Sequence, residues 1–483
     1  MFLMPMGAVS AYQIILAWIA NSFPRPFVKR SAAIALANMI GNTASIYGSY
    51  MWPDSAGPRY IPGGSATAAI AFLVAVLALV IRLVHVRMNK RLEEAETAQG
   101  DLAVGTNELE TRAVGFRENF TSIPILDFEQ ISSPSTKPVF LENLRDALVN
   151  VGFFYLRNAP ISPDLQSAFT AKGLELFQLP LEKKLEIEMV NSPHFLGYSK
   201  LGAEITALKQ DHREQFDAKL PAPGPDEPLY RNVVGPNQWP DETAIPGFRQ
   251  ATETYLSEVS ALAEQFRSLI AEALDLPSDA LDGVFDNPQQ HKLKLIKYPP
   301  PPASESDDSG FQGVGPHKDS GFLTFLLQAT PHRGLEVQNK AGSWIPAPPL
   351  PNTLVVNIGR ALEALTGGIC SATTHRVSLR REHFLDENGK SLGSRFSFPV
   401  FQGVSLDLSA ENISLVIPEH IRDLVKDDKV KSDAEATFNE MFHGSIGEGT
   451  FVARVTSHQD VGQRWYPDVL AKALKGQKDF VSR

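Results

Sequence analysis

Two histidines and one aspartate are spaced as a metal centre requires. His317 and Asp319 are separated by one residue, and His375 follows in a later apolar segment. Side chains two residues apart on a strand point to the same face, so His317 and Asp319 can reach one ion while Lys318 points away. Two imidazoles and one carboxylate fill three octahedral positions and leave three open, as Fe(II) oxygenases require for a co-substrate and O2. The sequence therefore predicts a catalytic Fe(II) site on these three residues.

A second pair of residues suits a small carboxylate. Arg395 and Ser397 would again share one face of a strand, where a guanidinium and a hydroxyl can bind a carboxylate together. Single matches to these short patterns arise by chance. His458-Gln459-Asp460 repeats the His-x-Asp pattern, and Arg376-Val377-Ser378 repeats the Arg-x-Ser pattern. Only the set that begins at His317 comes in the right order, with an apolar run after each element. We therefore interpret that set as one site.

Two stretches of this site resemble the isopenicillin N synthase-like 2-oxoglutarate/Fe(II) dioxygenases: Gly315-Pro316-His317-Lys318-Asp319-Ser320-Gly321 and Ser371-Ala372-Thr373-Thr374-His375-Arg376-Val377. The resemblance covers about residues 121–470. Further stretches agree with it: Ile123-Pro124-Ile125-Leu126-Asp127, Gly152-Phe153-Phe154-Tyr155, Asn237-Gln238-Trp239-Pro240 and Val355-Val356-Asn357-Ile358-Gly359. In that family a Tyr-Pro ends the strand before the metal motif, and its phenol helps to hold the co-substrate. Tyr298 occupies that place here.

The resemblance implies an α+β fold in which supporting helices surround a double-stranded β-helix, or jelly roll. It implies that the three metal ligands hold Fe(II), and that 2-oxoglutarate binds the iron while its far carboxylate meets Arg395, Ser397 and Tyr298. The expected reaction consumes O2, releases succinate and CO2, and oxidises a small organic metabolite by hydroxylation, desaturation or ring closure. Two alternatives stay open. One is an Fe(II) oxidase of the isopenicillin N synthase type that works without 2-oxoglutarate, and the other is a membrane transporter fragment with a relic oxygenase.

Three features depart from the family pattern. The gap between His375 and Arg395 is longer than usual, and residues 386–390 in it predict a turn at the tip of a lengthened hairpin. Arg376 is a competitor for the role of Arg395, but it directly follows a ligand and would face away from the metal on a strand. Ile296 stands where many members carry Asn, and Arg360 stands where the family usually has an acidic residue.

The expected organisation follows from the resemblance and from apolar periodicity. Apolar residues at helical spacing predict helices over residues 139–151, 163–179 and 248–276, the last of them as the helix that backs the barrel. The expected regions are an N-terminal non-haem dioxygenase region (121–240), the backing helix (241–287), the Fe(II)/2-oxoglutarate core (288–405) and a C-terminal region (406–483).

The first part of the chain has a different character. Residues 1–24, 31–53 and 63–81 contain no charged side chain, and each run is long enough to cross a bilayer. Basic residues after the first and third runs predict that the chain leaves the third helix on the cytoplasmic side. Residues 5–95 resemble the last three transmembrane helices of fungal allantoate-type major facilitator permeases through Trp18-Ile19-Ala20-Asn21, Ile40-Gly41-Asn42 and Gly57-Pro58-Arg59-Tyr60-Ile61-Pro62-Gly63-Gly64.

Because such permeases need many more helices, this transmembrane segment, residues 1–92, is expected to anchor the chain and not to transport. The oxygenase would then lie at the cytoplasmic side of a membrane. If the segment is instead the product of two neighbouring genes joined in one gene model, the oxygenase would be cytoplasmic. Residues 93–120 are polar and nearly free of aromatic residues, which is typical of a linker.

Charge separates the same two parts. Residues 1–92 carry eight Lys or Arg and one acidic residue, and since the whole chain has a net charge of −10, residues 93–483 carry −17. An acidic globular part offers no electrostatic footprint for nucleic acid. One cysteine, Cys370, excludes an internal disulfide and predicts a packed thiol. The expected partners are a small-molecule substrate and, through the N-terminal segment, a membrane; the sequence sets no oligomeric state.

Overall fold

A computed structural model describes residues 120–481, except for residues 207–208, 221–227, 288, 302–310, 414, 426–427 and 443. The chain divides into two compact units, residues 1–116 and 117–483, and the description below concerns the second. The three predicted membrane helices and most of the predicted linker lie outside the described residues. Within the described part, none of the helices combines the length and the apolar character needed to span a bilayer.

Two β-sheets form the centre of the described unit. The larger sheet has eight strands, in the order β1 (Ile125–Asp127), β2 (Phe153–Arg157), β12 (Thr353–Ile358), β9 (Leu323–Leu327), β14 (Arg395–Gln402), β7 (His291–Tyr298), β6 (Glu214–Lys219) and β3 (Gly197–Ser199). The smaller sheet has four, in the order β11 (Trp344–Pro346), β10 (Leu335–Gln338), β13 (His375–Leu379) and β8 (Phe311–His317). A separate pair joins β4 (Ile205–Thr206) to β5 (Lys209–Gln210).

The two sheets pack against each other through a shared buried cluster. Phe153, Val355 and Tyr298 of the larger sheet belong to the same cluster as Val337 and Val377 of the smaller one. Strands alternate their side chains between two faces, so one set of alternate residues enters this cluster, while in the larger sheet the other set packs against helices. The metal-ligand strands β8 and β13 therefore face the interior of a two-sheet barrel, as the sequence predicted.

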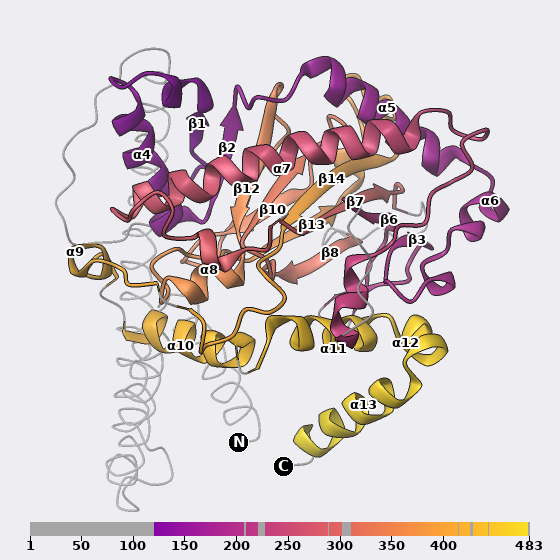
Figure 1. Ribbon diagram of the computed structural model, residues 1–483. Helices are drawn as coiled ribbons and strands as arrows, with labels where there is room; N and C mark the ends of the chain where they lie inside the picture. The colour runs from indigo at the N-terminus through magenta and orange to yellow at the C-terminus, as the bar shows by residue number, and fades with distance from the viewer. Residues whose placement is uncertain are drawn as a thin grey trace, which may run out of the picture. The chain divides into compact units, whose positions relative to one another are not determined.

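Helices cover the outer face of the larger sheet. Figure 1 shows α7 lying across that sheet, with α4 and α5 beside it. The helices are α4 (Lys137–Asp146), α5 (Pro163–Gln178), α6 (Leu181–Glu186), α7 (Phe248–Ala273), α8 (Arg360–Leu365), α9 (Glu419–Arg422), α10 (Asp428–Phe442), α11 (Ile446–Ser457), α12 (Gln459–Trp465) and α13 (Pro467–Val481). Shorter turns of 3-10 or π-helix are η3 (Phe128–Ser132), η4 (Ala147–Val151), η5 (Met189–Asn191), η6 (Leu229–Val234), η7 (Asp282–Val284) and η8 (Arg381–Phe384).

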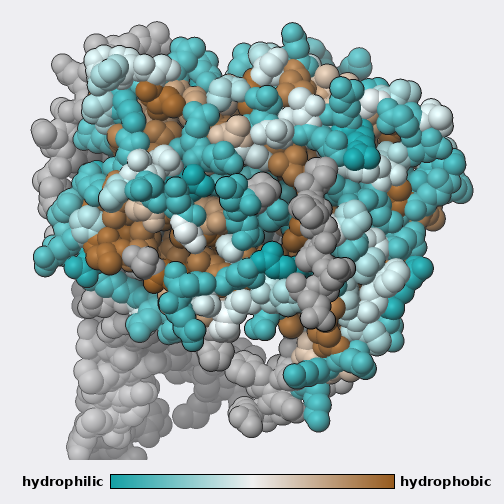
Figure 2. Space-filling model, in the orientation of Figure 1, coloured by the Kyte–Doolittle hydropathy of each residue, from teal (hydrophilic) through white to brown (hydrophobic). Residues whose placement is uncertain are grey.

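The three helices expected from apolar spacing are present. α7 buries Val259, Leu262, Phe266 and Ile270 along one stripe, and Phe266 stacks or packs edge-on against aromatic rings of the sheet. Burying one such side chain contributes about 2 kcal/mol to stability. α5 begins where Ser162 accepts a hydrogen bond from the backbone N–H of Leu165. Figure 2 shows hydrophilic side chains over most of this face, with hydrophobic side chains gathered in the hollows between helices.

The predicted turn in the long gap after His375 is present and closes a short hairpin in which Leu385 pairs with Ser391, but β13 and β14 do not form the arms of that hairpin. Asp386 accepts hydrogen bonds from the backbone N–H groups of Asn388 and Lys390, and Gly389 has a positive φ of 75°. However, β13 belongs to the smaller sheet and β14 to the larger one, so the segment crosses between sheets. The added length therefore lies in a surface turn and leaves the register of β14 on β7 intact.

Cys370 is fully buried, and burial raises the pKa of its thiol to about 12. This agrees with the predicted packed thiol, because a thiolate is disfavoured there.

A buried histidine in β7 makes stability depend on pH. Burial, with the nearby Lys219 cation, lowers the pKa of His291 to about 4, and neither ring nitrogen has a hydrogen-bond partner in the described part of the chain. The unfolded chain therefore takes up this proton first as the pH falls below the usual value of 6.5, and stability is lost down to pH 4. From pH 7 to pH 5 the wild-type chain should lose about 2 kcal/mol more unfolding free energy than His291→Leu. Urea unfolding at both pH values measures this, and equal losses would contradict it.

Candidate active site

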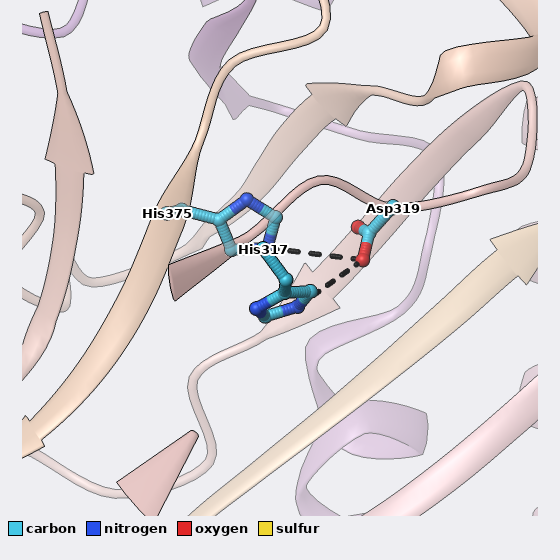
Figure 3. Close-up of side chains that lie close together, drawn as sticks. All are labelled: His317, Asp319 and His375. Atoms are coloured by element: carbon cyan, nitrogen blue, oxygen red, sulfur yellow. Dashed lines mark ion pairs between the residues drawn. The ribbon is translucent and has the colours of Figure 1, made fainter. Parts of the chain in front are cut away.

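The predicted metal ligands converge where two strands of the smaller sheet meet. β8 ends at His317, β13 begins at His375, and the antiparallel register pairs these two residues directly. Asp319 follows β8, with its Oδ1 3.5 Å from His317 Nε2 and 3.8 Å from His375 Nε2 (Figure 3). One ligand atom from each residue lies within 4.8 Å of the other two. The structure thus brings the whole sequence-predicted triad together.

Each histidine is held in the tautomer that a metal ligand needs. His317 Nδ1 lies 2.8 Å from the carbonyl oxygen of Gly315, and His375 Nδ1 lies 3.1 Å from that of Thr373. When each Nδ1–H donates to its carbonyl, the lone pair lies on Nε2, which faces the centre of the triad. Burial, reinforced by the neighbouring His317, lowers the pKa of His375 to about 4. Burial would also lower the pKa of His317, but the hydrogen bond to Asp319 and the charge of that carboxylate outweigh it and raise that pKa.

Asp319 is oriented by two side chains from the larger sheet. Its Oδ2 accepts a hydrogen bond of 2.6 Å from Thr324 Oγ1 on β9 and one of 2.8 Å from Asn357 Nδ2 on β12. Burial alone would raise the pKa of Asp319, but the two histidines and the Thr324 hydrogen bond hold it well below its usual range. The carboxylate is therefore ionised, and its Oδ1 is left to bind a metal ion.

This donor set fits a divalent iron ion. Two imidazole nitrogens and one carboxylate oxygen lie around a common centre, while the remaining hydrogen-bonding atoms of the three side chains are already engaged. Such a facial arrangement leaves open positions on the metal and is diagnostic of Fe(II) oxygenases.

The second predicted cluster also forms. Arg395 and Ser397 lie on β14, opposite Tyr298 and Ile296 of β7. Arg395 is 1% exposed, its Nη1 donates to Ser397 Oγ over 3.3 Å, and its guanidinium lies 4.9 Å from the centre of the Tyr298 ring. Among the described residues, its Nε has no hydrogen-bond partner and no acidic side chain forms an ion pair with it. Because a buried charge without a counter-ion is costly, this cluster fits an incoming carboxylate such as that of 2-oxoglutarate.

Arg376, which competed for the role of Arg395, and two residues that depart from the family pattern, Ile296 and Arg360, all make contacts of their own. Arg376 forms an ion pair of 2.6 Å with Glu336 and lies 4.0 Å over the Trp344 ring, so it already has an anion. Ile296 is buried in the cluster between the sheets. Arg360 forms an ion pair of 2.8 Å with Glu440.

A cavity of about 370 Å³ adjoins the triad. His317 and Asp319 line it, as do several basic residues that the sequence interpretation missed: Arg213, Lys219, Lys292, Lys294, Lys318 and Arg454. For two of these basic residues the sequence did contain a signal. Lys292 and Lys294 are two residues apart on the strand that ends at Tyr298, so alternation alone puts them on one face of it. Arg454, on α11, could not be placed because no local pattern brings the C-terminal helices to the barrel.

Removing the amide that orients Asp319 should weaken metal binding. Asn357→Ala leaves Oδ2 with the Thr324 hydrogen bond alone, so we expect Fe(II) affinity to fall about tenfold to a hundredfold. An anaerobic Fe(II) titration measures it, and Thr324→Val should act in the same direction. An unchanged Fe(II) affinity in both variants would contradict the orienting role.

The chain resembles known proteins over the same residues. Two protein-family models match the chain. The family described as non-haem dioxygenase in morphine synthesis, N-terminal, matches residues 123–242, and the 2OG-Fe(II) oxygenase superfamily matches residues 289–403. A 2-oxoglutarate-dependent dioxygenase from Gibberella zeae is 48% identical over 363 residues, which are 75% of this chain and 95% of that protein. The 2-oxoglutarate-dependent dioxygenase frbJ from Dothideomycetidae sp. is 46% identical, covering 74% of this chain and 96% of that protein.

A solved structure shares the fold. A full-length Neurospora crassa protein, crystallised in complex with alpha-KG, has a TM-score of 0.52 and 25% identity to this chain, over 64% of this chain and 91% of that protein. The two-sheet barrel described above is accordingly a jelly-roll oxygenase fold, as the sequence predicted.

Proposed function

Because this chain belongs to the 2OG-Fe(II) oxygenase superfamily and is a 2-oxoglutarate-dependent dioxygenase, we propose that it oxidises a small organic metabolite by hydroxylation, desaturation or ring closure. Its co-substrates are 2-oxoglutarate and O2, its metal is Fe(II), and we expect succinate and CO2 as co-products. Within the superfamily we place it in the isopenicillin N synthase-like group, on the motifs around His317 and His375. The cavity beside the triad is large enough for a metabolite.

In this proposal His317, Asp319 and His375 hold the iron. The bound iron would supply the activation of O2 that no amino-acid side chain can provide. The chain's own contribution is orientation: the carbonyls of Gly315 and Thr373 keep both Nε2 lone pairs on the metal side. Thr324 and Asn357 hold the carboxylate of Asp319 so that one oxygen faces the same point.

Arg395, Ser397 and Tyr298 would hold the far carboxylate of 2-oxoglutarate. Arg395 is almost fully buried and lacks an acidic partner among the described residues, which is the single observation that most supports a carboxylate co-substrate. A dicarboxylate bound there satisfies the guanidinium and leaves its other end free for the metal. The alternative oxidase without 2-oxoglutarate would use the same arginine for its own substrate.

Anaerobic visible absorbance tests the proposal. The chain is loaded with Fe(II), and 2-oxoglutarate is added in the absence of O2. We expect a charge-transfer band that appears with 2-oxoglutarate and is absent without it. Iron binding with no such band would favour the oxidase that works without 2-oxoglutarate, and no iron binding at all would indicate a relic.

We further propose that residues 1–92 attach the oxygenase to the cytoplasmic face of a membrane. Three uncharged runs with basic flanks support this. The full chain should remain in the membrane pellet after carbonate extraction, whereas residues 93–483 should be soluble. Recovery of the full chain in the soluble fraction would contradict the anchor, and two separate transcripts in place of one would show that the segment belongs to a neighbouring gene.

A further inference from the structure

The cavity beside the triad has a basic wall made by three elements. β6 ends at Lys219, and the antiparallel register pairs this residue with Lys292 of β7. Arg454 reaches the same cavity from α11, which comes from a part of the chain far away in sequence. Among the residues that line this cavity, the one acidic side chain is Asp319, which belongs to the triad.

Acidic groups behind the wall neutralise some of these cations but not all. Lys292 forms an ion pair with Asp217. Lys294 pairs with Glu204 over 3.0 Å, and Arg213 contacts Glu204 as well. A fourth lining cation, Lys318, pairs with Glu363 over 3.0 Å. These four cations therefore already have anions.

Lys219 and Arg454 are the two lining cations without an ion pair to any acidic side chain of the described residues. Burial and the repulsion of Arg454 outweigh the attraction of Asp286 and Asp217, and they lower the pKa of Lys219 to about 7. Arg454 likewise contributes to the lowered pKa of Lys292, after the effect of burial. The charges of Lys219 and Arg454 are therefore compensated only in part by acidic groups of the described residues, and a bound anion would relieve their repulsion.

The position of Lys219 is built into the fold. Asn237 accepts a hydrogen bond of 2.8 Å from the backbone N–H of Lys219 and donates one of 2.6 Å to its carbonyl oxygen. These two contacts hold the end of β6 where its last side chain meets the cavity. A surface lysine that happened to lie near a hollow would not have this support.

We propose that Lys219 and Arg454 bind an oxyanion of the substrate that is to be oxidised, a carboxylate or a phosphate. This inference rests on the proposed function and adds the chemical class of its substrate. The residues proposed for the far carboxylate of the co-substrate, Arg395, Ser397 and Tyr298, do not line this cavity, so the two anions would meet different basic groups. A cavity of about 370 Å³ suits a small acidic metabolite.

The test uses one carbon skeleton with four end groups. The full-length protein is loaded with Fe(II) and saturated with 2-oxoglutarate without O2, and calorimetry measures binding of 3-phenylpropanoate, 3-phenylpropyl phosphate, 3-phenylpropanol and 3-phenylpropylamine. We expect at least one of the two anions to bind about tenfold more tightly than the alcohol, and the amine to bind most weakly. The tighter anion distinguishes a carboxylate from a phosphate substrate.

Variants of the two cations test whether Lys219 and Arg454 cause the preference for an anion. Lys219→Met and Arg454→Met should each weaken the favoured anion about tenfold while changing the alcohol little, and Arg454→Lys should recover part of the loss. Lys200→Met is the matched control, because Lys200 is exposed, pairs with Glu188 and does not line the cavity. Equal binding of anion and alcohol, or an anion preference that survives both Met variants, would overturn the proposal.

The same samples separate this inference from the proposed function. The 2-oxoglutarate charge-transfer band reports the iron and co-substrate sites without any added probe. If the band forms and the anion preference is absent, the substrate class is wrong and the dioxygenase assignment stands. If Lys219→Met weakens 2-oxoglutarate binding and leaves the four probes unaffected, the basic wall serves the co-substrate and the inference is wrong.

Discussion

His375→Ala should abolish iron-dependent turnover and reduce Fe(II) affinity by at least about a hundredfold. The variant removes one of the three donors, and the remaining pair, His317 and Asp319, cannot hold a facial site on its own. Fe(II) content after anaerobic loading and gel filtration gives the first measurement, and succinate release with O2 present gives the second. Because both readouts depend on the metal, they should fall together.

A matched histidine shows whether the effect is specific. His458 begins the second His-x-Asp sequence, but it packs beside Phe195, lies 3.7 Å from Glu204 and is not a member of the metal-binding group. His458→Gln should therefore retain stoichiometric Fe(II). Thermal unfolding of the metal-free His375→Ala protein controls for misfolding. Full iron content and an unchanged rate in a folded His375→Ala protein would remove His375 from the ligand set.

Arg395→Gln should raise the 2-oxoglutarate concentration for half-maximal charge-transfer absorbance roughly a hundredfold, since it removes a buried charge-assisted contact. Iron content should stay unchanged, because Arg395 is not a member of the triad. The measurement is an anaerobic titration of the iron-loaded protein with 2-oxoglutarate. Glutamine keeps most of the side-chain volume and so limits the loss of packing at a residue that is 1% exposed.

Arg376→Gln is the corresponding control. In the wild-type chain Arg376 begins an Arg-x-Ser sequence like that of Arg395, yet its guanidinium already pairs with Glu336 and stacks on Trp344. The 2-oxoglutarate requirement should therefore change little in this variant. A large increase with Arg376→Gln and none with Arg395→Gln would exchange the two roles and contradict the co-substrate site proposed here.

The main parts of the candidate site were predictable from local patterns. The spacing of His317 and Asp319 predicted that both would reach one ion, and they do, although β8 ends at His317 and Asp319 follows the strand. Strand alternation was wrong for Lys318, which lines the same cavity as the two ligands. The same rule puts Arg395 and Ser397 side by side on β14. The amphipathic stripe of α7 likewise indicated a helix packed on one face. In each case the information lies within a few residues of chain.

Pairing between distant strands was beyond local patterns. The turn expected after His375 closes a short hairpin in which Leu385 pairs with Ser391, but β13 and β14 do not form its arms because they lie in different sheets. A turn signal says nothing of which sheet follows it. The contacts from Thr324 and Asn357 to Asp319 depend on how β9 and β12 lie next to each other. No spacing in the sequence expresses that arrangement.

The sequence by itself determined the chemistry: the residue types of the triad, the arginine and hydroxyl for a carboxylate, and the strands that carry them. Only the tertiary structure decided that Arg376 is paired with Glu336 while Arg395 is buried without an acidic partner among the described residues. It also brought Lys219 and Arg454 to one cavity beside the iron ligands. The physical reason is that burial and charge pairing are properties of neighbours in space, whereas the sequence orders neighbours only along the chain.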